Sequence, residues 1–96
     1  MEFDALPLHD ATLSAIHVSY EAARCDLRLN VVGGAAFQLV FEGFSALRFP
    51  RQEPWGRSCS VNTGRQVSTE VYEIELQSGD ALQVEARSWA FRPLEP

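Results

Sequence analysis

Apolar and polar residues alternate along much of the chain, and this alternation predicts β-strands. In residues 24–31 the side chains of Cys25, Leu27 and Leu29 are separated by charged or polar residues. Residues 14–20 alternate in the same way. An apolar residue at every second position is typical of a strand with one buried face and one solvated face. The sequence therefore predicts two neighbouring strands in this part of the chain.

These two strands are close enough in sequence to form a hairpin through residues 21–24. A register that places each inward residue opposite another inward residue should be strongly preferred, because a slip by one residue turns one apolar set to solvent. The predicted pairs are Tyr20 with Cys25, Val18 with Leu27 and Ile16 with Leu29.

A second hairpin is predicted in the last third of the chain. Residues 70–77 and 82–87 alternate regularly around the sequence Ser78-Gly79-Asp80. A loop over residues 77–79 would place Gly79 in the left-handed conformation of a bulged three-residue turn. This loop sets Ile74 opposite Leu82 and Tyr72 opposite Val84.

The middle of the chain is less regular. Residues 37–41 predict a third strand, and Gly43 marks a bulge or bend that leads to a fourth strand or edge segment in residues 44–49. The Pro- and Gly-containing stretch 50–69 is interpreted as irregular, with one short strand in residues 58–62. Short helical turns are expected near residues 6–12 and 51–55.

The chain is therefore predicted to be a single all-β domain over residues 1–96, mainly antiparallel and with little or no helix. We expect about five or six strands in a curled sheet, a small barrel or a sandwich. The aromatic residues Trp89 and Phe91 are expected to cover a sheet edge or an open end of the core. The predicted core consists of Ile16, Val18, Leu27, Leu29, Phe37, Leu39, Phe41, Tyr72, Ile74, Leu82 and Val84.

The charge of the chain limits the class of partner. The sequence has 13 acidic residues against 8 basic ones, all arginines, and its formal net charge is -5. A net acidic domain without a basic run supplies little phosphate neutralisation, so a nucleic-acid partner is not expected. Its field favours a basic partner instead. No signal peptide or membrane span is predicted, which indicates the cytoplasm, where Cys25 and Cys59 are expected as free thiols.

No common catalytic or phosphate-binding motif is present, so neither a catalytic set nor a cofactor is predicted. The polar residues His9, Asp10 and His17 form an alternative cluster that would suit a small enzyme or a metal-binding protein. The spacing matches no metal-ligand motif, so no metal ligand is assigned. The simpler interpretation is that His9 and Asp10 bind nearby backbone and fix the entry to the first strand.

Binding residues are predicted at two places. Trp55 and Arg57 lie in the irregular stretch and belong to the residue types enriched in binding hot spots, although Trp55 could instead plug the end of the sheet. Asn62 and the acidic stripe Glu73, Glu75 and Glu85 form a second candidate surface, which could equally be an ordinary solvated face. A third hypothesis is binding of a small ligand inside a β cup.

Three segments, LHDATLSAIHV, FSALRFPRQEPWGRSCSVN and YEIELQSGDALQVEA, together resemble a family of small bacterial β-domain proteins of unknown function, similar in layout to immunity-type proteins. The resemblance implies a bacterial cytoplasmic protein that binds another protein, and it assigns no role to single residues. The leading hypothesis is therefore a protein-interaction module without enzymatic activity. A homodimer formed through sheet edges or an apolar face is a further expectation.

Overall fold

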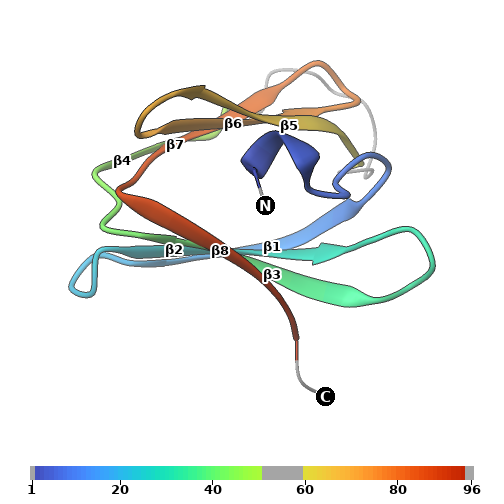
Figure 1. Ribbon diagram of the computed structural model, residues 1–96, viewed down its shortest axis with the longest axis horizontal. Helices are drawn as coiled ribbons and strands as arrows, with labels where there is room; N and C mark the ends of the chain where they lie inside the picture. The colour runs from blue at the N-terminus through green and yellow to red at the C-terminus, as the bar shows by residue number, and fades with distance from the viewer. Residues whose placement is uncertain (1, 51–59, 95–96) are drawn as a thin grey trace.

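The computed structural model describes residues 2–50 and 60–94, and in it two antiparallel sheets face each other as a sandwich (Figure 1). One sheet has the strand order β1-β2-β3-β8. It consists of β1 (Thr12–Ser19), β2 (Arg24–Asn30), β3 (Ala36–Glu42) and β8 (Ser88–Pro93). The other sheet has the order β4-β7-β6-β5. It consists of β4 (Ala46–Arg48), β7 (Ala81–Glu85), β6 (Val71–Leu76) and β5 (Val61–Ser68).

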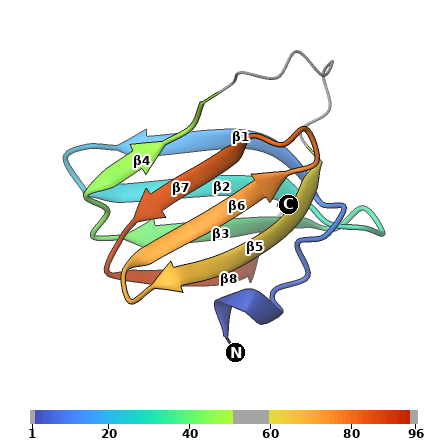
Figure 2. The ribbon, with the colours of Figure 1, turned by 90° about the horizontal axis from the view of Figure 1, so that it is seen from above.

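The chain passes between the sheets twice at one end of the sandwich. Gly43 follows β3 with a φ of 64° and turns the chain toward β4, as the sequence predicted for a bend at this residue. The return passage runs from β7 to β8. Viewed from above, β4 lies on the same side of the sandwich as β1, and β5 lies on the same side as β8 (Figure 2).

The gap between β5 and β8 is closed by the N-terminal segment, which begins with a short 3-10 turn, η1 (Phe3–Ala5). The ring of Phe3 is 1% exposed and packs against three aromatic rings from both sheets. These rings belong to Phe41, Tyr72 and Trp89, with centroid separations of 6.1, 5.0 and 5.4 Å. Aromatic side chains thus fill the interior at this side of the sandwich.

The predicted all-β, antiparallel class is confirmed, but the predicted strand count was too low. The described residues form eight strands, and the two sheets are not joined into a closed barrel. Two strands were missed. Residues 61–68, expected to be largely irregular, form β5, and the C-terminal aromatics belong to β8, which pairs with β3. The expected helical turn near residues 6–12 lies earlier in the structure, at Phe3–Ala5, whereas the one near residues 51–55 falls outside the described residues.

The β6–β7 hairpin has the predicted register. Ile74 pairs with Leu82 and Tyr72 pairs with Val84. The backbone N–H of Leu76 donates to the carbonyl of Asp80 at 2.8 Å, and Gly79 has a φ of 101°. A φ in this range is accessible to glycine without the penalty that a Cβ would add, so Gly79 sets the turn and the turn sets the register.

The predicted register of the first hairpin was wrong by two residues. Val18 pairs with Cys25, whereas Leu27 was expected opposite it. Ile16 pairs with Leu27, whereas Leu29 was expected. A shift of two leaves the apolar residues on the same face, so alternation alone could not separate the two registers. The turn over residues 20–23 decides between them, because Ala23 adopts a φ of 52° and the Ser19 hydroxyl accepts a hydrogen bond from the Ala22 N–H.

The centre of the predicted core is buried, but its outer members are not. Eight of the predicted core residues, all in the central strands, are at most 3% exposed. They are Leu27, Leu29, Leu39, Phe41, Tyr72, Ile74, Leu82 and Val84. Phe37 and Ile16 are only partly buried, Val18 is 48% exposed, and Tyr20, which was expected to face inward, is 92% exposed. Val18 lies in the edge strand β1 and Tyr20 in the turn that follows it, so neither is covered by a neighbouring strand on both sides.

Cys25 is a fully buried free thiol in the centre of the first sheet, and burial raises its pKa to about 11. A Cys59→Ser variant leaves Cys25 as the single thiol for labelling. Relative to the usual pKa of 9.0, the shift lowers the thiolate fraction at pH 8 by about 100-fold. We therefore expect at least this reduction in the rate of reaction with a soluble disulfide reagent, measured against the protein unfolded in urea. Equal rates in the two states would contradict the buried position of Cys25.

Candidate functional site

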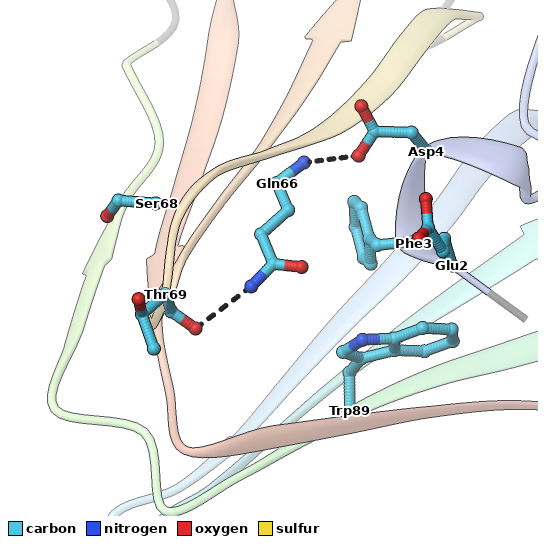
Figure 3. A pocket seen from close by; sticks show the side chains of 7 residues that line it. All are labelled: Glu2, Phe3, Asp4, Gln66, Ser68, Thr69 and Trp89. Carbon is cyan, nitrogen blue, oxygen red and sulfur yellow. Dashed lines mark hydrogen bonds between the residues drawn. The ribbon is translucent and has the colours of Figure 1, made fainter.

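A recess of about 540 Å³ opens beside the N-terminal segment, where η1, the end of β5 and the start of β8 meet (Figure 3). Recesses of this size are typical of small-ligand and side-chain binding sites. The lining combines two acidic residues, two aromatic residues and three neutral polar residues. They are Glu2, Asp4, Phe3, Trp89, Gln66, Ser68 and Thr69.

Hydrogen bonds fix the polar side of this recess. The backbone N–H of Gln66 donates to Oδ1 of Asp4 at 2.9 Å, and the Gln66 side-chain amide donates to the carbonyl of Thr69 at 2.9 Å (Figure 3). The first bond ties η1 to β5, and the second holds the amide over the turn between β5 and β6. The recess is therefore held in shape without a ligand.

The aromatic side of the recess is provided by Trp89. Its indole is half-buried and meets the ring of Phe3 edge to face, with an interplanar angle of 84°. Figure 3 shows the indole lying across the recess from the Gln66 side chain, and Glu2 also lines the recess. Glu2 is exposed and forms no ion pair within residues 2–50 and 60–94. A recess lined by an aromatic residue and two acidic residues favours a cation, because both kinds of group attract positive charge.

Among the residues predicted for binding, the acidic stripe is only partly available. Glu73, Glu75 and Glu85 lie on the outward face of the second sheet, as the alternation predicted. Arg65 forms an ion pair with Glu73 at 3.0 Å, and the Asn62 amide donates to Glu75 at 2.7 Å. Glu73 and Glu75 are thus bound by residues of β5, of which the sequence predicted only the first part as a short strand in residues 58–62.

The structure brings His9 and Asp10 to Asn62 in one polar network at the other end of β5. Nδ1 of His9 donates to the Asn62 carbonyl at 2.7 Å. The Gln77 amide donates to Asp10 at 2.5 Å, and the Asp10 backbone N–H donates to the Val61 carbonyl at 2.8 Å. These bonds tie the N-terminal segment to the edge of the second sheet. The local interpretation of His9 and Asp10, in which they fix the entry to β1, is consistent with this geometry.

His17 does not join this network. It pairs with Asp26 on the outward face of the first sheet, where Asp26 accepts hydrogen bonds from Arg24 at 2.8 Å and Gln38 at 3.1 Å. Within the part of the chain that the structure describes, no group of three or more His, Cys, Asp or Glu residues could hold a metal ion. Trp55 and Arg57 lie outside the described residues.

Sequence reasoning did not assign the residues of the recess. Glu2 and Asp4 were not predicted as binding residues, and Trp89 was predicted only to cover a sheet edge or an open end of the core. Gln66, Ser68 and Thr69 lie in a stretch that was interpreted as irregular. The one feature of the sequence that points to this recess is the segment Glu2-Phe3-Asp4, in which two acidic residues flank an apolar residue.

Comparison with known proteins returned no matching family, no matching curated protein and no matching solved structure. Among the described residues, no helix is long and apolar enough to cross a membrane. The geometry of the recess is thus the main basis for a functional conclusion.

Proposed function

We propose that this domain is a protein-interaction module and that the recess beside η1 receives a basic side chain of its partner. The observation that carries the proposal is that the aromatic residue Trp89 and the acidic residues Glu2 and Asp4 line one recess. A guanidinium group can stack on an indole and donate to a carboxylate at the same time, which a neutral side chain cannot do. The net charge of -5 favours the same class of partner and speeds association with it.

The resemblance to immunity-type proteins supports a more specific form of this proposal, in which the domain binds another protein in the bacterial cytoplasm. Arg57 and Trp55 would then extend the contact beyond the recess. Formation of a homodimer is an additional proposal, and sedimentation at several concentrations tests it independently of the recess.

The recess is tested by titration with N-acetyl-arginine amide, followed by the fluorescence of Trp89 in a Trp55→Phe background. A single side chain on an exposed site should bind weakly, with a Kd on the order of 1–10 mM. We expect Glu2→Gln to raise this Kd about two- to fivefold, because it removes one exposed charge. Trp89→Leu should raise it by a similar factor of about two to five, because the aromatic face is lost. That variant is followed by the backbone NMR shifts of Gln66 and Thr69, since it lacks the fluorescent group.

Glu75→Gln is the matched control, because it removes a carboxylate from the far end of β6 and keeps an acceptor for Asn62. It should leave the Kd unchanged within a factor of about 1.5, allowing for a small field effect. The proposal is wrong if the arginine derivative does not bind up to 50 mM, a concentration about five times the upper expected Kd. It is also wrong if all three variants change the Kd equally.

A further inference from the structure

A second recess, of about 440 Å³, is also bordered by the turn between β5 and β6. Ser68 and Thr69 line the first recess, and the next residue, Glu70, lines the second. The other residues that matter here are Phe44, Glu85 and Arg87. The two recesses therefore share this turn as part of their lining.

The walls of the second recess are fixed by backbone hydrogen bonds between loops. The Phe44 N–H donates to the Ala23 carbonyl at 3.0 Å, and the Ala86 N–H donates to the Glu70 carbonyl at 2.9 Å. A Cβ at Gly43 would lie 2.9 Å from Cγ and Cδ of Arg87, so the arginine stem lies directly against the Gly43 backbone. This close contact and the φ of 64° both require glycine at this position. The recess is thus preformed.

Both recesses are lined by two acidic residues and by an aromatic residue, and the second is also lined by Arg87. The first combines an aromatic ring, Trp89, with the carboxylates of Glu2 and Asp4. The second combines the half-buried ring of Phe44 with the carboxylates of Glu70 and Glu85. Neither Glu70 nor Glu85 forms an ion pair within the described part of the chain, in contrast to Asp26 and Glu73, which are paired with arginines.

We propose that the partner presents two basic side chains from one extended segment, one in each recess, with the segment passing over the β5–β6 turn. This inference rests on the proposed function and specifies its partner as a dibasic protein segment. Charge complementarity carries the assignment, because two acidic residues and an aromatic residue line each recess. Arg87 lowers the attraction of the second recess for a cation, so the second side chain binds more weakly than the first.

The test uses peptides of the form acetyl-Arg-(Gly)n-Arg-amide with n from 0 to 4. These spacers separate the two Cα atoms by about 4 to 18 Å when extended. Linking two sites gives a local concentration in the millimolar range, so we expect the best spacer to lower the Kd about three- to tenfold below that of N-acetyl-arginine amide. Only a subset of spacers should show this gain, because too short a linker cannot span both recesses.

Variants then locate the second arginine. Glu70→Gln and Glu85→Gln should each reduce the gain in affinity that the second arginine provides. Both variants should keep the Kd of N-acetyl-arginine amide within a factor of about 1.5 of the wild-type value. Arg87→Gln should increase the gain about two- to fivefold, because a competing positive charge is removed. Glu75→Gln removes the same charge elsewhere and should not change the gain.

The results separate this inference from the function on which it rests. If N-acetyl-arginine amide fails to bind, the proposed function is wrong and the dibasic partner falls with it. If it binds but no spacer improves the affinity, or Glu75→Gln reduces the gain as much as Glu70→Gln does, the dibasic inference alone is overturned. A concentration-dependent dimer that Glu70→Gln weakens would instead identify a second copy of this chain as the occupant and would also overturn it.

Discussion

Replacing Phe3 by alanine is expected to lower the free energy of unfolding by about 3–5 kcal/mol, the usual cost of removing a buried aromatic ring. The Phe3 ring is 1% exposed and contacts rings from both sheets. Its removal leaves a cavity between β5 and β8, which no other described segment closes. Urea denaturation of the wild type and the variant, followed by far-UV circular dichroism, measures the difference.

Tyr20→Ala is the control for this experiment, because Tyr20 is also aromatic but is 92% exposed in a turn. Its effect should stay within about 0.5 kcal/mol. A loss below about 1 kcal/mol for Phe3→Ala would be too small for a buried aromatic anchor. Such a result would mean that the N-terminal segment does not hold the two sheets together.

The sequence was most informative where one turn determined the register. In the β6–β7 hairpin, Gly79 selected the turn, and the alternating residues then had one consistent pairing. In the β1–β2 hairpin no glycine marked the turn. Ala23 adopts a left-handed φ of 52° there, which is uncommon for a residue with a Cβ and is hard to anticipate from sequence. Alternation fixed which residues face inward, but the turn decided which residues pair.

The missed strand β5 shows a different limit of sequence analysis. Only Val61 and Gly64 are buried in it, and the register shifts twice along its pairing with β6. An edge strand needs few apolar residues, because only part of one face touches the core. Its polar sequence therefore lacks the alternation that identified the central strands, and its position follows from pairing with β6.

The recess could not be predicted because its walls are far apart in sequence. Glu2 and Asp4, Gln66 and Thr69, and Trp89 come from three segments that meet only in the folded sandwich. The net charge of -5 favoured a basic partner, and this stays a prediction. The structure adds a place where an aromatic ring and carboxylates occur together, which composition alone cannot supply.

Under the proposed function, the N-terminal segment links stability to binding. Phe3 anchors the segment in the core, and its neighbours Glu2 and Asp4 carry the carboxylates of the recess. The bond from the Gln66 N–H to Asp4 then aligns η1 with β5. A variant that loosens this segment should therefore weaken binding of a basic side chain even when it leaves every carboxylate in the chain.

The packing of this segment on β5 depends on Gly64, and Gly64→Ala is expected to destabilise the domain by about 1–3 kcal/mol through overpacking. A Cβ at this position would lie 2.5 Å from Cδ1 of Leu8 and 3.4 Å from a ring carbon of Phe3. Leu8 is 1% exposed, so its side chain has little room to move. In an uncrowded strand the same substitution would normally stabilise by about 0.5–1 kcal/mol, so the sign of the effect tests the contact.

A double-mutant cycle with Leu8→Ala isolates this contact. Leu8→Ala alone should cost about 2–5 kcal/mol, because it opens a cavity in the core. In the double variant the methyl group introduced by Gly64→Ala occupies part of that cavity, so the combined loss should be smaller than the sum by about 0.5–3 kcal/mol. Thr63→Ala, at the exposed neighbouring position, should instead add to Leu8→Ala within about 0.5 kcal/mol. Additive losses for Gly64→Ala and Leu8→Ala would contradict the close approach of the N-terminal segment to β5, since only direct contact between the two side chains lets one substitution relieve the other.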